Sequence, residues 1–117
     1  MEYTLKKSLG QHFLHDDKIC HAIVDAIPAC ERLLEVGPGA GAITKYILQI
    51  SGVDFKAVEL DDEKVAYLFK TYPSLTGKII HQSFLDMEKP FNGSFTIVGN
   101  FPYNISTQIL FKTLDWR

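Results

Sequence analysis

Residues 33–41 constrain the fold more than any other stretch, because an apolar run leads directly into three closely spaced glycines. The apolar part is typical of a short buried strand, and residues 42–48 behind the glycines are typical of the first turns of a helix. Gly37, Gly39 and Gly41 predict a sharp turn that a ligand can approach closely. An open α/β sheet builds a nucleotide-binding pocket in this way, at the carboxyl end of its first strand.

The glycine turn alone does not select one ligand. Gly37, Gly39 and Ala42 also fit the dinucleotide fingerprint, and a tight turn without a ligand is the simplest alternative. Glu59 sharpens the interpretation, because it ends the next apolar run and lies 22 residues after Gly37. That offset is close to the roughly 20 residues expected of a carboxylate that binds ribose hydroxyls. The alternative for Glu59 is a solvated acid at the end of a strand.

Strand-like and helix-like segments alternate, which predicts an α/β chain with a Rossmann-like, doubly wound and mostly parallel sheet. Strands are expected at residues 32–36, 55–59, 78–81 and 95–99. Helices are expected at residues 17–27, from residue 42 to near Gly52, at residues 62–72, and from residue 104 onward. Their expected apolar faces carry Ile19, Ile23, Ala26 and Ile27, then Ile43, Ile47 and Ile50, then Val65, Leu68, Phe69 and Tyr72, and finally Ile109, Leu110 and Leu114.

Length and composition bound the remaining possibilities. The 117 residues suffice for one small domain, and the formal net charge of −2 provides no overall attraction to nucleic acid. The N-terminus lacks the apolar segment of a signal peptide, and no stretch is long enough to span a bilayer. Cys20 and Cys30 lack metal-ligand spacing, so we expect no metal and free thiols in a reducing cytoplasm. Since no stretch is long enough to span a bilayer, we also expect no membrane contact.

The segment that follows the fourth expected strand indicates the chemistry. Asn100 offers an amide oxygen as an acceptor, and Pro102 fixes the backbone so that nearby carbonyls can point into a site. Tyr103 offers a flat ring for stacking. Two acceptors beside a stacking ring suit the exocyclic amine of adenine, whose lone pair they localise for attack on an electrophilic methyl group. A proline-bearing turn with an aromatic plug is the structural alternative.

Four stretches in this order resemble the small-subunit ribosomal RNA adenine dimethyltransferase family, which uses S-adenosylmethionine. They are Leu9-Gly10-Gln11-His12-Phe13-Leu14, Glu35-Val36-Gly37-Pro38-Gly39-Ala40-Gly41, Val58-Glu59-Leu60-Asp61 and Asn100-Phe101-Pro102-Tyr103-Asn104-Ile105-Ser106. Similar enzymes methylate two adjacent adenosines near the 3′ end of small-subunit ribosomal RNA, each twice. The resemblance therefore implies the small ribosomal subunit as a partner and a target base that is flipped or looped out.

The resemblance also implies roles for individual residues. The glycine floor under the methionine part of the cofactor would be Gly37 and Gly39, and Glu59 would bind the ribose. The N-terminal arm would line the cofactor site with Gln11, His12 and Leu14. The target amine would be held by Asn100, which also borders the cofactor, and by the carbonyl of Pro102, with Tyr103 stacked on the base.

One position departs from the family pattern. After the third expected strand the family usually has an acid that contacts the cofactor adenine, and here that position is Ser83, with Asp86 three residues later. A serine can hydrogen-bond to an adenine edge but lacks the charge that strengthens such bonds. We therefore expect somewhat weaker cofactor binding and an unchanged reaction.

The sequence also suggests an incomplete enzyme. Residues 1–117 match the N-terminal part of the catalytic domain, and family members continue with further strands and a helical C-terminal domain that helps to bind RNA. We expect the chain alone to be inactive on ribosomes, and a four-stranded sheet with an open edge to pair with another copy. Three other functions stay open at this point: a macrolide-resistance type methyltransferase acting on large-subunit RNA, an NAD-dependent oxidoreductase, and a non-catalytic RNA-binding or assembly factor.

Overall fold

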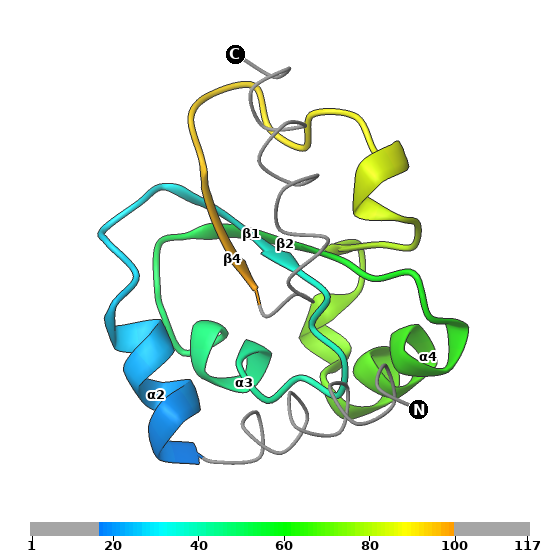
Figure 1. Ribbon diagram of the computed structural model, residues 1–117, viewed down its shortest axis with the longest axis horizontal. Helices are drawn as coiled ribbons and strands as arrows, with labels where there is room; N and C mark the ends of the chain where they lie inside the picture. Colours follow the sequence, from blue (N-terminus) through cyan, green and yellow to red (C-terminus); the bar gives the residue numbers. More distant parts are fainter. Residues whose placement is uncertain (1–16, 100–117) are drawn as a thin grey trace, which may run out of the picture.

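A computed structural model describes residues 17–99, and these residues form a four-stranded parallel sheet with helices packed on it (Figure 1). The strands are β1 (Arg32–Val36), β2 (Asp54–Val58), β3 (Ile79–Ile80) and β4 (Thr96–Gly99), in the spatial order β3-β2-β1-β4. All three pairings are parallel, and the reversal of strand order between β1 and β4 is the switch point at which α/β sheets bind ligands. The predicted α/β class is confirmed.

The two faces of the sheet are covered differently because successive side chains of a strand point to opposite sides. Leu33 of β1 joins the core beneath the helices α2 (Asp17–Asp25), α3 (Thr44–Ile47) and α4 (Asp62–Thr71), which lie together on one side of the sheet in Figure 1. Leu34 and Val36 pack on the other side against the short 3₁₀ helix η2 (Phe84–Asp86) and the segment that follows it. The helical face therefore also receives Glu35, the one acid of β1.

The predicted strands are confirmed to within two residues at each end, and the helices are shorter than expected. α2 ends at Asp25, and its buried residues are Cys20 and Val24, so the expected inward positions of Ile19 and Ala26 are wrong. The helix behind the glycine turn spans four residues, and Ile50 is 38% exposed. The reason is that residues 38–43 form turns before regular helical bonding begins at Lys45, whose N–H donates to the carbonyl of Gly41.

α4 follows the prediction more closely. Asp61 precedes it and accepts hydrogen bonds from the N–H groups of Glu63 and Lys64, which caps the helix start. Val65 and Leu68 are buried, whereas Phe69 lies on the exposed side. The 3₁₀ helix η1 (Pro73–Leu75) begins at the proline directly after residue 72, where the helix was expected to end.

Within residues 17–99, β4 has one neighbouring strand, and the helices include none long and apolar enough to cross a membrane. Pairing of the sheet edge with a second copy of the chain stays a prediction. The expected result for the isolated chain is a dimer mass by light scattering at micromolar concentration, because an exposed strand edge is a ready template for pairing. A stable monomer mass over the same concentration range would contradict it.

Candidate functional site

The carboxyl ends of the parallel strands bring the predicted cofactor residues to one edge of the sheet. Gly37 follows β1 directly, Glu59 follows β2, and Ser83 follows β3 after a gap of two residues. The strand order places these three segments side by side. On the other flank, Gly99 at the end of β4 pairs with Val36 of β1, so β4 ends where the glycine turn begins.

The glycine turn has the backbone that the sequence predicted. Gly37, Gly39 and Gly41 adopt φ angles of +68°, +58° and +86°, which L-residues with a side chain rarely adopt. A Cβ built on Gly37 or Gly39 would have no atom of residues 17–99 within 4 Å, so the described part of the chain leaves the space over these two glycines open. These two glycines therefore leave a cradle for a ligand in contact with the backbone.

Gly41 serves a different purpose from the one expected. A Cβ at this position would lie 2.8 Å from Cε2 of Tyr72 and 3.2 Å from Cδ2 of Leu68. The third glycine thus allows close packing of the turn against α4 and the residue after it. The prediction that all three glycines make room for a ligand is wrong for Gly41.

This difference gives a measurable stability effect. We expect Gly41→Ala to reduce the free energy of unfolding by about 1–3 kcal/mol more than Gly77→Ala, because only the first substitution overpacks the core. Gly77 is the matched control, because its φ is +82° and its Cβ would meet no atom of the described part of the chain within 4 Å. Urea unfolding of both variants measures the difference, and equal losses would contradict the packing role of Gly41.

Glu59 lies against the glycine turn, as its spacing predicted. The side chain is 9% exposed. Its Oε1 accepts a hydrogen bond from the N–H of Gly39 at 3.0 Å, and its Oε2 accepts one from the N–H of Asp61 at 3.0 Å. Each carboxylate oxygen has a second lone pair, so the group can still accept hydrogen bonds from the hydroxyls of a ligand.

Ser83 is the N-cap of η2, and its Oγ accepts a hydrogen bond from the N–H of Leu85 at 3.3 Å. The side chain is half-buried. Asp86 lies at the end of η2 and is exposed. The serine therefore provides the local cap that an aspartate would also provide.

The sequence reasoning missed a buried carboxyl group directly beneath the turn. Glu35 is 2% exposed, and Thr44, which is fully buried, donates a hydrogen bond from Oγ1 to its Oε1 at 2.5 Å. This bond joins the end of β1 to the first residue of α3 and so closes the glycine turn at its base. The available signal was an acid inside an otherwise apolar strand.

Burial raises the pKa of Glu35 to about 7, with a smaller contribution from the negative charge of Glu59; the Thr44 hydrogen bond acts in the opposite direction. The desolvation of a carboxylate dominates because water does not reach this group. Glu35 is therefore partly protonated at neutral pH, unlike an ordinary glutamate.

The other predicted site residues lie outside the described residues. They are Gln11, His12 and Leu14 of the N-terminal arm, and Asn100, Pro102 and Tyr103 after β4. Their roles stay predictions. Among residues 17–99, no group of three or more His, Cys, Asp or Glu side chains is placed to hold a metal ion.

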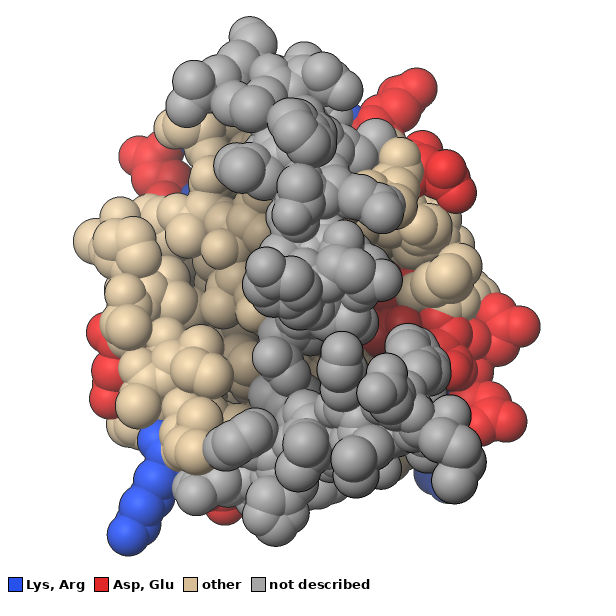
Figure 2. Space-filling model, viewed as in Figure 1, with Lys and Arg blue, Asp and Glu red and all other residues tan. Residues whose placement is uncertain are grey.

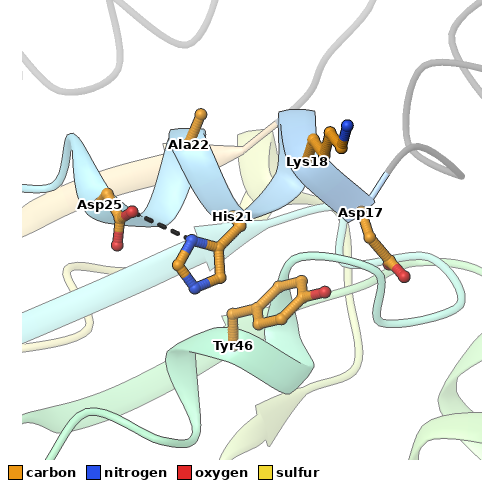
Figure 3. Close-up of a pocket in the computed structure, with 6 residues that line it drawn as sticks. All are labelled: Asp17, Lys18, His21, Ala22, Asp25 and Tyr46. Atoms are coloured by element: carbon orange, nitrogen blue, oxygen red, sulfur yellow. Dashed lines mark ion pairs between the residues drawn. The ribbon is translucent and has the colours of Figure 1, made fainter.

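A shallow cavity of about 440 Å³ lies away from the glycine turn, between α2 and α3 (Figure 3). In it His21 faces Asp25, with Nδ1 3.0 Å from the carboxylate, and its ring meets the edge of Tyr46. Both partners of the ion pair are mostly exposed. The ring contact ties α2 to α3, whereas the His21–Asp25 pair lies within α2, and neither contact provides a buried polar group for a ligand.

The charges visible in Figure 2 bear on nucleic-acid binding. Acidic side chains gather on the side where α4 lies, and the exposed acids of that region include Asp61, Asp62 and Glu63. The described Lys and Arg side chains in this view lie at the rim. A phosphate backbone needs a concentration of positive charge, and the described part of this face does not present one.

Comparison with known proteins assigns the chain to a family. The family model described as ribosomal RNA adenine dimethylase matches residues 2–117. The chain belongs to this family. Among curated relatives, the ribosomal RNA small subunit methyltransferase A of Phocaeicola vulgatus is 50% identical over 117 residues, with 96% of this chain and 41% of the relative covered. The corresponding protein of Cytophaga hutchinsonii is 46% identical and 45% covered, again over 96% of this chain.

Solved structures agree on the fold. The crystal structure of the 23S rRNA methyltransferase ErmE matches with a TM-score of 0.67 and 27% identity, covering 89% of this chain and 41% of that one. A dimethyladenosine transferase from Plasmodium falciparum matches with a TM-score of 0.65 and 22% identity, covering 84% of this chain and 36% of that one. The chain spans less than half the length of these curated relatives and structures.

Proposed function

We propose that this chain binds S-adenosylmethionine at the carboxyl ends of β1 and β2 and forms the cofactor-binding part of an adenine dimethyltransferase for small-subunit ribosomal RNA. One observation carries the proposal. The Glu59 carboxylate accepts a hydrogen bond from the N–H of Gly39, beside the space over Gly37 and Gly39 that the described residues leave open. A carboxylate next to a glycine cradle fits a ligand that has both a ribose and an extended chain. Membership of the ribosomal RNA adenine dimethylase family supports S-adenosylmethionine rather than NAD as this ligand.

The described residues divide the work of binding. Gly37 and Gly39 let the extended part of the ligand lie against the backbone, and Glu59 accepts hydrogen bonds from the ribose hydroxyls. Ser83 offers a hydroxyl to the edge of the adenine. When bound, S-adenosylmethionine supplies an electrophilic methyl group on a positively charged sulfur.

In this proposal, the residues that follow β4 in the sequence bind the target adenosine. Asn100 and the carbonyl of Pro102 hold the exocyclic amine, and Tyr103 stacks on the base at about 1–3 kcal/mol. The N-terminal arm contributes Gln11, His12 and Leu14 to the cofactor site. The proposed partner is the small ribosomal subunit, and the product is two adjacent dimethylated adenosines near the 3′ end of its RNA.

A direct test uses the protein in its natural full-length form, labelled S-adenosylmethionine and small subunits that lack the modification. The expected result is label on two adjacent adenosines of the small-subunit RNA, and little label in an Asn100→Ala variant. Label on large-subunit RNA would favour the resistance-type activity instead, in keeping with the structural similarity to ErmE. A normal rate in Asn100→Ala would contradict the role of Asn100.

Ligand choice is tested separately by thermal shift. We expect S-adenosylhomocysteine to raise the melting temperature and NAD to leave it unchanged, because a ligand that binds only the folded state stabilises it. A shift with NAD alone would favour the oxidoreductase alternative.

Ser83 offers a gain-of-affinity prediction. Ser83→Asp keeps a good N-cap for η2 and adds a charged acceptor at the adenine position, so we expect cofactor binding to tighten by about fivefold. Calorimetry measures the change. Ser51→Asp is the matched control, because it adds the same charge in the exposed connection that precedes β2, at the opposite edge of the sheet. Equal affinities of Ser83→Asp and the wild type would contradict the prediction.

A further inference from the structure

Glu35 is a buried acid for which the proposed binding scheme has no direct use. It does not line the open space over the glycines; it lies below the turn, hydrogen-bonded to Thr44. The turn between these two residues is the segment on which the proposed cofactor rests. Because Glu35 is buried, water screens it weakly from a charge that binds on the turn, and the electrostatic interaction between the two is therefore strong.

Among residues 17–99, the groups that face Glu35 do not supply a positive charge. Thr44 of α3 is neutral, Glu59 after β2 carries a like charge, and Tyr72 after α4 is a neutral phenol in electrostatic contact with Glu35. Its strand neighbours Ala57 and Val98 are apolar. Lys45, the cation next to Thr44 in sequence, is instead paired with Asp17 at 2.9 Å.

We propose that Glu35 is a positioning residue that gives up its proton to solvent when a positively charged ligand binds on the glycine turn. The inference rests on the proposed binding of S-adenosylmethionine, whose sulfonium and ammonium groups would provide the charge. Without a cation, the protonated carboxyl and Thr44 close the base of the turn as a neutral pair. With a cation above the turn, the carboxylate balances the ligand's charge and still accepts the hydrogen bond from Thr44.

The test is calorimetry of S-adenosylmethionine binding to the full-length protein in buffers of different ionisation enthalpy, which counts the protons released. We expect the wild type to release about half a proton more than Glu35→Gln at pH 7, and the difference to vanish near pH 9, where Glu35 is already ionised. Subtracting the proton count of Glu35→Gln from that of the wild type removes the contribution of the ligand's own amine, which is the same in both titrations. A merely structural Glu35 would leave the proton count unchanged.

Thr44→Val provides a second and independent readout. Loss of the hydroxyl removes the hydrogen bond that favours the carboxylate, so the pH range of proton release should move upward. Thr44→Ser keeps the hydroxyl and should restore the wild-type range. Should Glu35→Gln bind too weakly for titration, this shift decides the matter.

The outcomes separate the two proposals. Binding with equal proton counts in the wild type and Glu35→Gln overturns the proton-release inference and leaves the cofactor site standing. Failure of the folded wild type to bind S-adenosylmethionine or S-adenosylhomocysteine overturns both. A release difference that disappears at high pH and shifts in Thr44→Val supports the inference.

Discussion

Replacing Glu59 by alanine is expected to weaken the binding of S-adenosylmethionine by about 100-fold. The substitution removes the carboxylate that is proposed to accept hydrogen bonds from two ribose hydroxyls, and hydrogen bonds to charged groups contribute about 1.5–3 kcal/mol each. A loss of about 3 kcal/mol corresponds to roughly two orders of magnitude in Kd. Calorimetry with S-adenosylmethionine and S-adenosylhomocysteine measures the change.

The control for this experiment is Glu63→Ala, which removes the same charge from an exposed position on α4. It should bind like the wild type. Glu59→Ala also leaves the N–H groups of Gly39 and Asp61 without their acceptor, so circular dichroism must first show that the variant is folded. A folded Glu59→Ala with wild-type affinity would rule out the ribose role.

The stability of the wild type is expected to fall by about 3 kcal/mol, relative to Glu35→Gln, as the pH rises from 4.5 to 8. The unfolded Glu35 loses its proton near its ordinary pKa of 4.5, whereas the folded one retains it until about pH 7. Between these values the native state binds more protons than the unfolded state, so raising the pH favours unfolding. Below pH 4.5 both states are protonated and the contribution is constant.

Urea unfolding at several pH values, with the ligand absent, measures this difference between the two proteins. Glu35→Gln keeps an oxygen that can accept from Thr44 but cannot ionise, so its own curve lacks the contribution of this group. Glu63→Gln is the control for neutralising an exposed acid. Parallel curves for the wild type and Glu35→Gln would show that Glu35 ionises normally in the folded protein.

The sequence predicted the sheet more accurately than the helices. The strand at 32–36 matches β1 at both ends because an apolar run bounded by a proline-containing segment and a glycine has few other solutions. The helix after the glycine turn was expected to stop near Gly52, and it ends at Ile47. Tertiary packing explains the difference, because Ile43 and Ile47 are buried in the core whereas Ile50 is 38% exposed and contributes little burial to a longer helix.

The part of the candidate site that follows from the order of strands along the chain could be predicted from the sequence. Glu59 meets Gly39 because consecutive parallel strands end at the same edge of the sheet, which the sequence pattern already implies. The Glu35–Thr44 pair could not be foreseen in this way. Whether an acid in a strand faces a helix or solvent depends on which layers cover the sheet, and the partner of Glu35 depends on where α3 begins.

The hydrogen-bonded register of β4 on β1 has a consequence for how the protein can vary. Val36 and Gly99 lie side by side through strand pairing, although more than sixty residues separate them along the chain. The alignment of these two strand ends is therefore independent of the lengths of the loops in between. Insertions in the exposed connections around Gly52 or Gly77 should leave this alignment intact, whereas one extra residue inside β4 would shift everything that emerges from its end.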